Sequence, residues 1–334
     1  MTEPRADSGA DSGVDSGGER LARSLVEVAG ADQVRAVLLF GSRLVQATPD
    51  RFSAYDLVLI VESYRKFYEA LDRAGLSRRS PRIQAALNHV LAPNIIAFAP
   101  DGWSGGPVAK IMVLEPSAME RAIARRSPDH FVKGRLVQRV AVLHARDGNA
   151  GRWIEGLLGG ARRDVLRWVG PYLEGSFTPA DAALRMLQVS YRGEVRPEAR
   201  DRVLDVFECQ RAYLTAELAS ALAEAERAGQ VAREGERYRV VRAAAGRTHA
   251  RLYFARSKVR ATARWLKHVV TFDNWLDYIA RKVERRTGTR VEITDWERRL
   301  PYLLLWPKVF RVLRTRPQRR DTAAPADAGS RAPR

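Results

Sequence analysis

Two short apolar runs, separated by a glycine-serine turn, constrain the fold more than any other feature of this sequence. The first run, RAVLLF at 35–40, ends at Gly41-Ser42, and the second, YDLVLIV at 55–61, carries one aspartate, Asp56. Short runs rich in Val, Ile and Leu and closed by glycine are typical of buried strands. We therefore expect two neighbouring strands of an α/β domain, with Asp56 on the second.

The pattern around these strands predicts a mixed α/β unit over residues 19–148. Apolar residues at helical spacing indicate helices at 20–29, 64–74, 83–91 and 117–126. Further apolar runs indicate strands at 94–99, 108–114 and 139–143. A turn rich in proline and glycine over 100–106 separates two of these strands and favours a hairpin.

The second half of the chain is mostly helical in pattern. Thr178-Pro179 is typical of a helix start, and residues 196–226 predict one long helix. A short strand or wing at 234–241 suggests that the helical domain, 149–240, has a winged-helix form. A basic region follows at 241–316 and ends in an amphipathic helix, while residues 1–18 and 317–334 have the composition of disordered segments.

The cysteine content and the net charge indicate in which cell compartment the protein works and what kind of partner it binds. Cys209 is the only cysteine, which excludes a disulfide framework within one chain and favours a reducing, cytosolic compartment. No run approaches the roughly 20 apolar residues of a membrane span, and the start lacks a secretory signal pattern. The net charge of +18 predicts an anionic partner. Most of the excess lies at 238–316, with 20 Lys plus Arg against 6 Asp plus Glu.

The glycine-serine turn and Asp56 together predict a nucleotide site. Gly41 lets the backbone approach a phosphate, and the Ser42 hydroxyl and nearby amides can hold the phosphates of a nucleotide. Asp56, on the next strand, can bind Mg²⁺, which prefers oxygen ligands and bridges to substrate phosphates. This arrangement resembles the polymerase-β-type nucleotidyltransferases. The alternative is a plain turn at Gly41 and an ordinary strand-edge charge at Asp56.

The superfamily usually has two aspartates two residues apart, and this chain lacks the second. Ala54 and Val58 occupy the positions two away from Asp56, and neither side chain can bind a metal. Glu62 shares the face of Asp56 but lies roughly 20 Å along the strand, at about 3.3 Å per residue. Asp101 and Glu115, at the ends of other predicted strands, are better candidates for a further carboxylate, although both suit ordinary turn positions.

Six blocks between residues 39 and 196 resemble, in order, the mitochondrial-type phosphatidate cytidylyltransferases of the translocator assembly and maintenance family. The blocks are LFGS at 39–42, YDLVLIVE at 55–62, FY at 67–68, KIMV at 110–113, VKGRL at 132–136 and SYRGEVR at 190–196. Arg43 stands where the family has glycine, Glu194 where it has aspartate, and Gln138-Arg139-Val140 where it has Lys-Pro-Val.

The resemblance implies transfer of CMP from CTP to phosphatidic acid, giving CDP-diacylglycerol and pyrophosphate. It implies catalytic roles for Asp56, Arg135 and Arg196, and Mg²⁺ bound by Asp56, with Asp101 as a candidate second ligand. The implied nucleotide-binding residues are Gly41, Ser42, Arg43, Lys110, Ser190 and Tyr191. We expect a cytoplasmic protein bound peripherally to the inner face of the membrane, with contacts through Leu303, Trp306, Phe310 and Leu313.

Two alternatives remain open. The net charge suits a nucleotidyltransferase or binding protein that acts on RNA or another phosphate acceptor, although no RNA-binding motif is recognisable. The absent carboxylate partner of Asp56 suits a non-catalytic sensor of nucleotide or lipid. Each cation of the six blocks could also be an ordinary solvated surface charge, and Ser190-Tyr191 could pack in the core.

Overall fold

A computed structural model describes most of the first 271 residues. The described residues are 15–47, 49, 53–102, 106–193, 200–241, 246–271 and 296. Contacts divide the chain into two units, residues 1–273 and 274–334, and every described residue except Trp296 belongs to the first. The predicted membrane stripe of Leu303, Trp306, Phe310 and Leu313 lies outside the described residues, as does Arg196. The fold below is that of the first unit.

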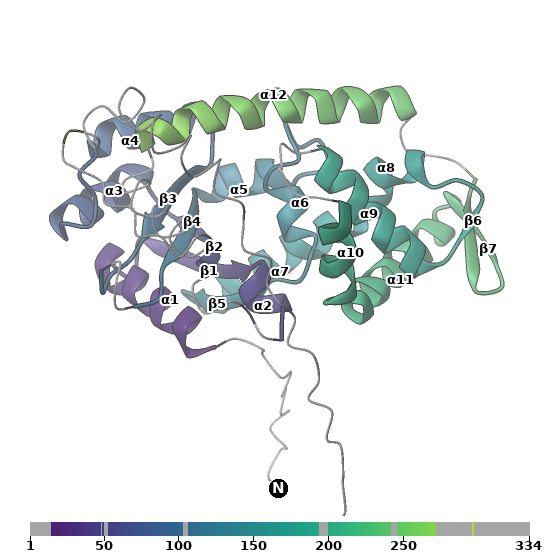
Figure 1. The fold of residues 1–334 in the computed structure, drawn as a ribbon, viewed down its shortest axis with the longest axis horizontal. Helices are drawn as coiled ribbons and strands as arrows, with labels where there is room; N and C mark the ends of the chain where they lie inside the picture. Colours follow the sequence, from purple (N-terminus) through teal and green to yellow (C-terminus); the bar gives the residue numbers. More distant parts are fainter. Residues whose placement is uncertain are drawn as a thin grey trace, which may run out of the picture. The chain divides into compact units, whose positions relative to one another are not determined.

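A five-stranded mixed sheet forms the centre of the N-terminal part, with the order β3-β4-β2-β1-β5 (Figure 1). Its strands are β1 Val34–Phe40, β2 Tyr55–Val61, β3 Asn94–Phe98, β4 Ala109–Leu114 and β5 Ala141–Ala145. β2 and β4 run parallel, while the other neighbouring pairs are antiparallel. The predicted mixed sheet and the hairpin of β3 and β4 are confirmed. In β1 and β2 every residue is buried except Arg35 and Asp56.

Helices pack around this sheet. They are α1 Ser16–Ala29, α2 Ser42–Val45, α3 Tyr64–Arg73, α4 Pro81–Val90, α5 Pro116–Ile123, α6 Lys133–Leu136 and α7 Gly148–Arg163. α1 contacts β1, β5 and α3, whereas α5 contacts β2, and α7 contacts β1 and β5. Apolar residues at helical spacing predicted α1, α3, α4 and α5 to within a few residues, whereas the one-turn helices α2 and α6 were not predicted.

α1 begins earlier than the sequence suggests. We expected disorder up to residue 18 and a helix from residue 20, but the helix starts at Ser16. The Asp15 carboxylate caps it by accepting a hydrogen bond from the Gly18 N–H at 3.1 Å. The same carboxylate accepts a hydrogen bond from the Tyr55 hydroxyl at 2.6 Å. A contact with β2 therefore orders the last Asp-Ser-Gly repeat.

The C-terminal part of the unit combines helices with a small sheet of order β6-β8-β7. Its elements are α8 Val165–Val169, the 3₁₀ helix Gly170–Tyr172, β6 Ser176–Phe177, α9 Pro179–Gly193, α10 Arg200–Glu208, α11 Arg211–Arg227, β7 Val231–Glu234 and β8 Arg237–Val240. A strand, three helices and a hairpin follow one another in this order, and the winged-helix form stays a prediction. Thr178 begins α9 as predicted, since its hydroxyl accepts a hydrogen bond from the Asp181 N–H at 3.2 Å.

The single long helix expected over 196–226 is wrong, because the structure has a break between α10 and α11 at Cys209-Gln210. Gln210 has an extended φ of −135° and is buried. Its amide nitrogen donates to Gln138 Oε1 at 3.0 Å, and its oxygen accepts from the Arg139 N–H at 3.3 Å. These contacts with a distant loop hold Gln210 out of the helical conformation.

α12, Arg247–Thr271, runs along the whole unit, from the small sheet and α8 to α4 (Figure 1). It contacts α9, α4 and β3. Its basic character was expected, and it forms most of the described part of the predicted basic region 241–316. Among the described residues, no helix has both the length and the apolar character needed to cross a bilayer.

Candidate functional site

Gly41 and Asp56 meet where β1 ends and β2 begins. The antiparallel register pairs Phe40 with Asp56, so the residue after Phe40 lies beside the aspartate. Gly41 has a φ of +81°, and a Cβ added there would lie 2.8 Å from Asp56 Oδ2. Only glycine combines that backbone conformation with such a close approach. The two residues predicted to form the site are therefore in direct proximity.

Ser42 and Arg43 hold the turn against the segment that leads into β2. The Ser42 and Ser53 hydroxyl oxygens are 3.2 Å apart, and Arg43 Nε donates to the Ser53 carbonyl at 2.9 Å. The Arg43 guanidinium also lies 4.7 Å from the centre of the Tyr55 ring and 3.5 Å from Asp15 Oδ2. Arg43 thus has structural contacts on the α1 side, and its predicted contact with a nucleotide stays a prediction.

The exposed Asp15 and the buried Tyr55 form a hydrogen-bonded pair beside this turn. Burial and, to a smaller extent, the hydrogen bond to Asp15 raise the pKa of Tyr55 to about 12. Tyr55 precedes Asp56 in β2, and successive side chains of a strand point to opposite faces. The Asp15 contact therefore lies on the other side of the sheet from the Asp56 carboxylate.

The three carboxylates considered as partners of Asp56 lie in different parts of the structure. Glu62 binds Arg35 Nε and Arg146 Nη1, each at 2.8 Å. Glu115 accepts a hydrogen bond from the Tyr64 N–H at 2.8 Å. Asp101 lies in the loop between β3 and β4, at the end of the sheet where β2 begins. Among the described residues, no three His, Cys, Asp or Glu side chains gather in a metal-binding group.

Lys110 lies beside Asp56, and basic side chains of α6 and α12 are in the surroundings of Lys110 and His268. Lys110 on β4 is the direct register partner of Asp56 on β2, and paired residues of parallel strands point to the same face. His268 on α12 is close to both Lys110 and Arg135. Burial, together with the charges of Lys267, Lys110, Arg264 and Arg135, lowers the pKa of His268 to about 3. His268 therefore stays neutral beside these basic side chains at neutral pH.

Arg135 is held by an aromatic contact on α6. Its guanidinium stacks 4.0 Å from the centre of the Phe131 ring and donates to the Phe131 carbonyl. Arg264 from α12 lies 4.9 Å from the same ring. Phe131 therefore brings one cation of α6 and one cation of α12 to the same place.

The Gly134 and Ser190 blocks do come together, but inside the protein. A Cβ on Gly134 would lie 2.6 Å from Ser190 Oγ. Ser190 is 1% exposed, and its hydroxyl is 3.0 Å from His130 Nε2. Tyr191, the next residue of α9, is partly exposed. The structure thus gives Ser190 a packing contact, and its predicted contact with a nucleotide stays a prediction.

A buried ionic cluster fixes α12 to the rest of the unit. Asp129 is 4% exposed and accepts hydrogen bonds from Arg260 Nε and Arg264 Nη2, each at 2.7 Å. Burial alone would raise the pKa of Asp129, but the hydrogen bond and charge of Arg264, aided by Arg260, outweigh burial and lower the pKa. The Asp129 carboxylate therefore stays charged and holds α12 in place.

Lys267 makes a second attachment, at the C-terminal end of α4. Its ammonium group donates to the carbonyls of Leu87 at 3.3 Å and Pro93 at 3.2 Å, and also to the Leu91 carbonyl. Burial, with the charge of Arg264, lowers the pKa of Lys267 to about 7. Asp129 and Lys267 together hold the end of α12 that carries His268 against α4 and β3.

The sequence did not reveal the part that α12 takes in the site. No histidine was among the residues predicted to form the site. His268 instead lies among the site cations, and His130 bonds to Ser190. One signal was available: the 25 residues of α12 carry basic side chains and no acidic one.

Comparison with known families supports a nucleotidyltransferase. Residues 18–73 match the family model of streptomycin adenylyltransferase. The matched segment contains β1, Gly41, Ser42, β2 and Asp56, so it covers the geometry described above. No curated protein matches the chain. The match supports the predicted polymerase-β-like superfamily, and it ends before the Lys110, Gly134 and Ser190 blocks.

Proposed function

We propose that this chain transfers a nucleoside monophosphate from a nucleoside triphosphate to an acceptor that already carries a phosphate. We further propose that the donor is CTP and the acceptor phosphatidic acid. The observation that carries the proposal is the contact of Gly41 with Asp56, which has Lys110 of β4 as its register partner. A triphosphate and a phosphorylated acceptor are both polyanions, and this part of the sheet is cationic.

The proposed step needs little from the protein beyond binding and orientation. An oxygen of the acceptor phosphate attacks the α-phosphorus, a new P–O bond forms, and the bond to the β-phosphate breaks as pyrophosphate leaves. The acceptor oxygen is already ionised, so no side chain has to remove a proton. His268 would be a weak base, because its pKa is about 3. Lys110 and Arg135 would offset the charge on the phosphates, and Ser42 would hold a phosphate oxygen by hydrogen bonding.

One carboxylate is enough for a metal held mainly by substrate. Mg²⁺ commonly binds one or two carboxylates together with phosphate oxygens and water. Asp56 fits that mode, whereas Ala54 and Val58 leave no partner for a second metal. When bound, Mg²⁺ would neutralise charge on the triphosphate and the leaving pyrophosphate. Asp56 would orient it from the start of β2.

The choice of CTP and phosphatidic acid rests on the resemblance of the six blocks. Two of these blocks, at Gly134 and Ser190, lie 56 residues apart in the sequence and touch in the fold. A lipid acceptor also requires the protein to reach a bilayer, and the basic region 241–316 suits an anionic membrane surface. We therefore propose peripheral binding at the inner face of the membrane.

Adenylyl transfer to a small molecule is the second candidate, because the matched family is named for streptomycin adenylylation. Two observations favour the phosphate acceptor. Streptomycin is a cation, which Lys110 and Arg135 would repel. Transfer to a hydroxyl also benefits from a general base, and Asp56 is the carboxylate that the described part of the site offers.

Nucleic acid is less well suited to this fold as an acceptor. In a helix-turn-helix arrangement the last helix commonly enters the DNA groove, and here that helix is α11. α11 carries Glu217, Glu224 and Glu226 against Arg211 and Arg227, a net negative charge. Binding to a phosphate backbone would need the opposite sign.

The test is an assay of purified protein with labelled CTP, short-chain phosphatidic acid and Mg²⁺. We expect labelled CDP-lipid and pyrophosphate, and a fall of about 10²-fold or more in Asp56→Asn. Asp72→Asn, an exposed carboxylate on α3, is the matched control and should keep full activity. The activity of Asp101→Asn tests whether the β3–β4 loop supplies a second ligand for Mg²⁺.

Parallel reactions with ATP and streptomycin, and with each triphosphate and an RNA oligonucleotide, separate the rival acceptors. Product from streptomycin or RNA but not from phosphatidic acid would refute the lipid acceptor. Calorimetric binding of CTP without turnover on any acceptor would show a sensor instead of an enzyme. Unchanged activity in Asp56→Asn would refute the assignment of the active site to Asp56.

A further inference from the structure

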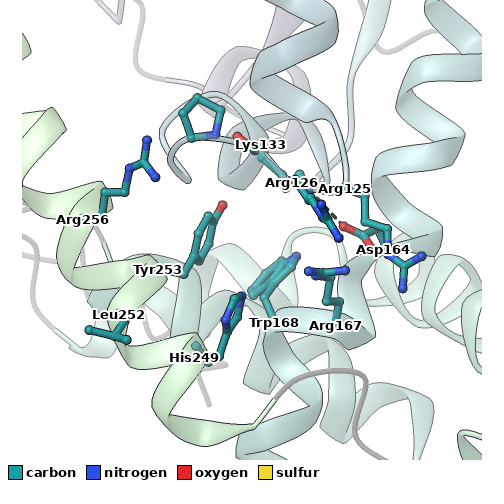
Figure 2. A pocket seen from close by; sticks show the side chains of 13 residues that line it. Arg125, Arg126, Lys133, Asp164, Arg167, Trp168, His249, Leu252, Tyr253 and Arg256 are labelled. Carbon is teal, nitrogen blue, oxygen red and sulfur yellow. Dashed lines mark hydrogen bonds and ion pairs between the residues drawn. The ribbon is translucent and has the colours of Figure 1, made fainter.

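A second cationic pocket lies away from Asp56. It has a volume of about 470 Å³ and opens between the segment after α5, the start of α6, α8 and the first half of α12 (Figure 2). That volume is within the range of small-molecule sites. Its lining residues, all in the described part of the chain, do not include Gly41, Ser42, Asp56, Lys110 or Arg135. The pocket is therefore a different site from the one proposed above.

Three guanidinium groups in this pocket have no counter-ion among the described residues. Arg126, Arg167 and Arg256 line it, and the structure gives none of them an ion pair. The one carboxylate in the lining, Asp164, already binds Lys133 at 3.1 Å and Arg125 at 3.8 Å. The remaining charge is positive and faces one space, as Figure 2 shows.

The polar groups of the pocket are mainly donors. Trp168 lines the pocket and is 5% exposed, and its buried Nε1–H has no hydrogen-bond partner among the described residues. A buried indole N–H normally has a partner. The three guanidinium groups add further N–H donors and no acceptor. A ligand that satisfies them must be rich in acceptors and negatively charged, and phosphate has both properties.

One side of the pocket is apolar. Tyr253 and Leu252 of α12 line it, and the Leu252 side chain is 66% exposed. The Tyr253 hydroxyl is 3.2 Å from His130 Nδ1, which fixes the ring against the wall. A bare phosphate ion would leave this apolar edge uncovered, whereas the organic part of an ester would cover it.

We propose that this pocket binds a phosphate ester. Arg126, Arg167 and Arg256 hold its phosphate together with Trp168 Nε1, and its organic group lies against Tyr253 and Leu252. The ester could be a soluble nucleoside monophosphate or the headgroup of a phospholipid, which present the same phosphate chemistry. The site does not depend on the proposed activity, since it shares no residue with the Asp56 site.

The experiment is calorimetric titration of the full chain with CMP, glycerol 3-phosphate and dioctanoyl phosphatidic acid. We expect at least one to bind at a saturable site, and Arg167→Gln and Arg256→Gln each to weaken that binding by about tenfold. Arg251→Gln is the matched control, because it removes the same charge from the exposed surface of α12 outside the pocket. It should change the dissociation constant by less than about twofold.

Two further variants decide the proposal. Asp56→Asn should keep the Arg256-dependent binding, and its loss in that variant would place the ligand at the catalytic site. Trp168→Phe should weaken binding by removing one donor while it keeps a ring in place. No saturable binding of any of the three esters, or equal weakening by Arg251→Gln and Arg256→Gln, would overturn the proposal. Which ester binds most tightly separates a nucleotide from a lipid headgroup.

Discussion

At Gly41 the chain brings backbone and carboxylate closer together than any other residue would allow. The φ of +81° disfavours a side chain, and the Asp56 carboxylate occupies the place of a Cβ. Gly75 also has a positive φ, +68°, but nothing lies within 4 Å of its Cβ position. The two glycines therefore separate the effect of backbone strain from the effect of contact with Asp56.

We expect Gly41→Ala and Gly75→Ala each to lower the free energy of unfolding by about 1–3 kcal/mol, the usual range for strained backbone. Only Gly41→Ala should also displace Asp56, and a misplacement of this kind can lower turnover by about 10²-fold. Urea unfolding and the CTP assay measure the two effects. Equal activity in both variants would show that the Gly41 contact is not needed for function.

α12 contributes to the site only while its anchors hold it. Asp129 binds Arg260 and Arg264 in a buried cluster, and Lys267 binds the end of α4. His268 follows Lys267 directly, so its place beside Lys110 depends on these contacts. The helix therefore acts as a rigid connection between the loop after α5 and the cationic face of the sheet.

Asp129→Asn should weaken both stability and nucleotide binding. It leaves Arg264 buried without its counter-ion, and removing one partner of a buried pair costs about 3 kcal/mol or more. Glu208→Gln, in the exposed pair with Arg211, is the control and should leave the urea midpoint close to that of wild type. A normal midpoint for Asp129→Asn would mean that the cluster does not hold α12.

At the scale of the whole molecule, charge and burial make stability depend on pH. In the folded protein His268 stays neutral down to a pH of about 3, against an ordinary pKa of 6.5. The unfolded chain takes up a proton at this histidine below pH 6.5, whereas the folded protein does not. This group therefore favours unfolding as the pH falls from about 6.5 to about 3.

Urea unfolding of wild type and His268→Gln over this pH range tests the effect. The stability of wild type relative to the variant should fall by up to about 1.4 kcal/mol per pH unit, the linkage for one proton. His249→Gln, on an exposed position of the same helix, controls for the loss of an imidazole. A difference between wild type and His268→Gln that does not change with pH would contradict the buried placement of His268.

The sequence by itself determined the strands, most helices and the position of the motif. β1 and β2 are short apolar runs that each bury nearly all their residues, and local pattern is sufficient to identify such runs. Gly41, Ser42 and Asp56 could be chosen because a glycine turn and a lone charge stand out against apolar strands. The family match at 18–73 covers the same segment. The boundary between the first two predicted domains, at residue 148, stays a prediction.

Only the tertiary structure decided what surrounds that motif. The register that pairs Asp56 with Lys110, the contact of Gly134 with Ser190, and the bond between His130 and Ser257 join residues far apart in the chain. The break at Gln210 likewise follows from contacts with Gln138 and Arg139. Such contacts depend on how elements pack, which periodicity and local propensity do not encode. The glycine-serine turn was therefore predictable, whereas the cations that face it were not.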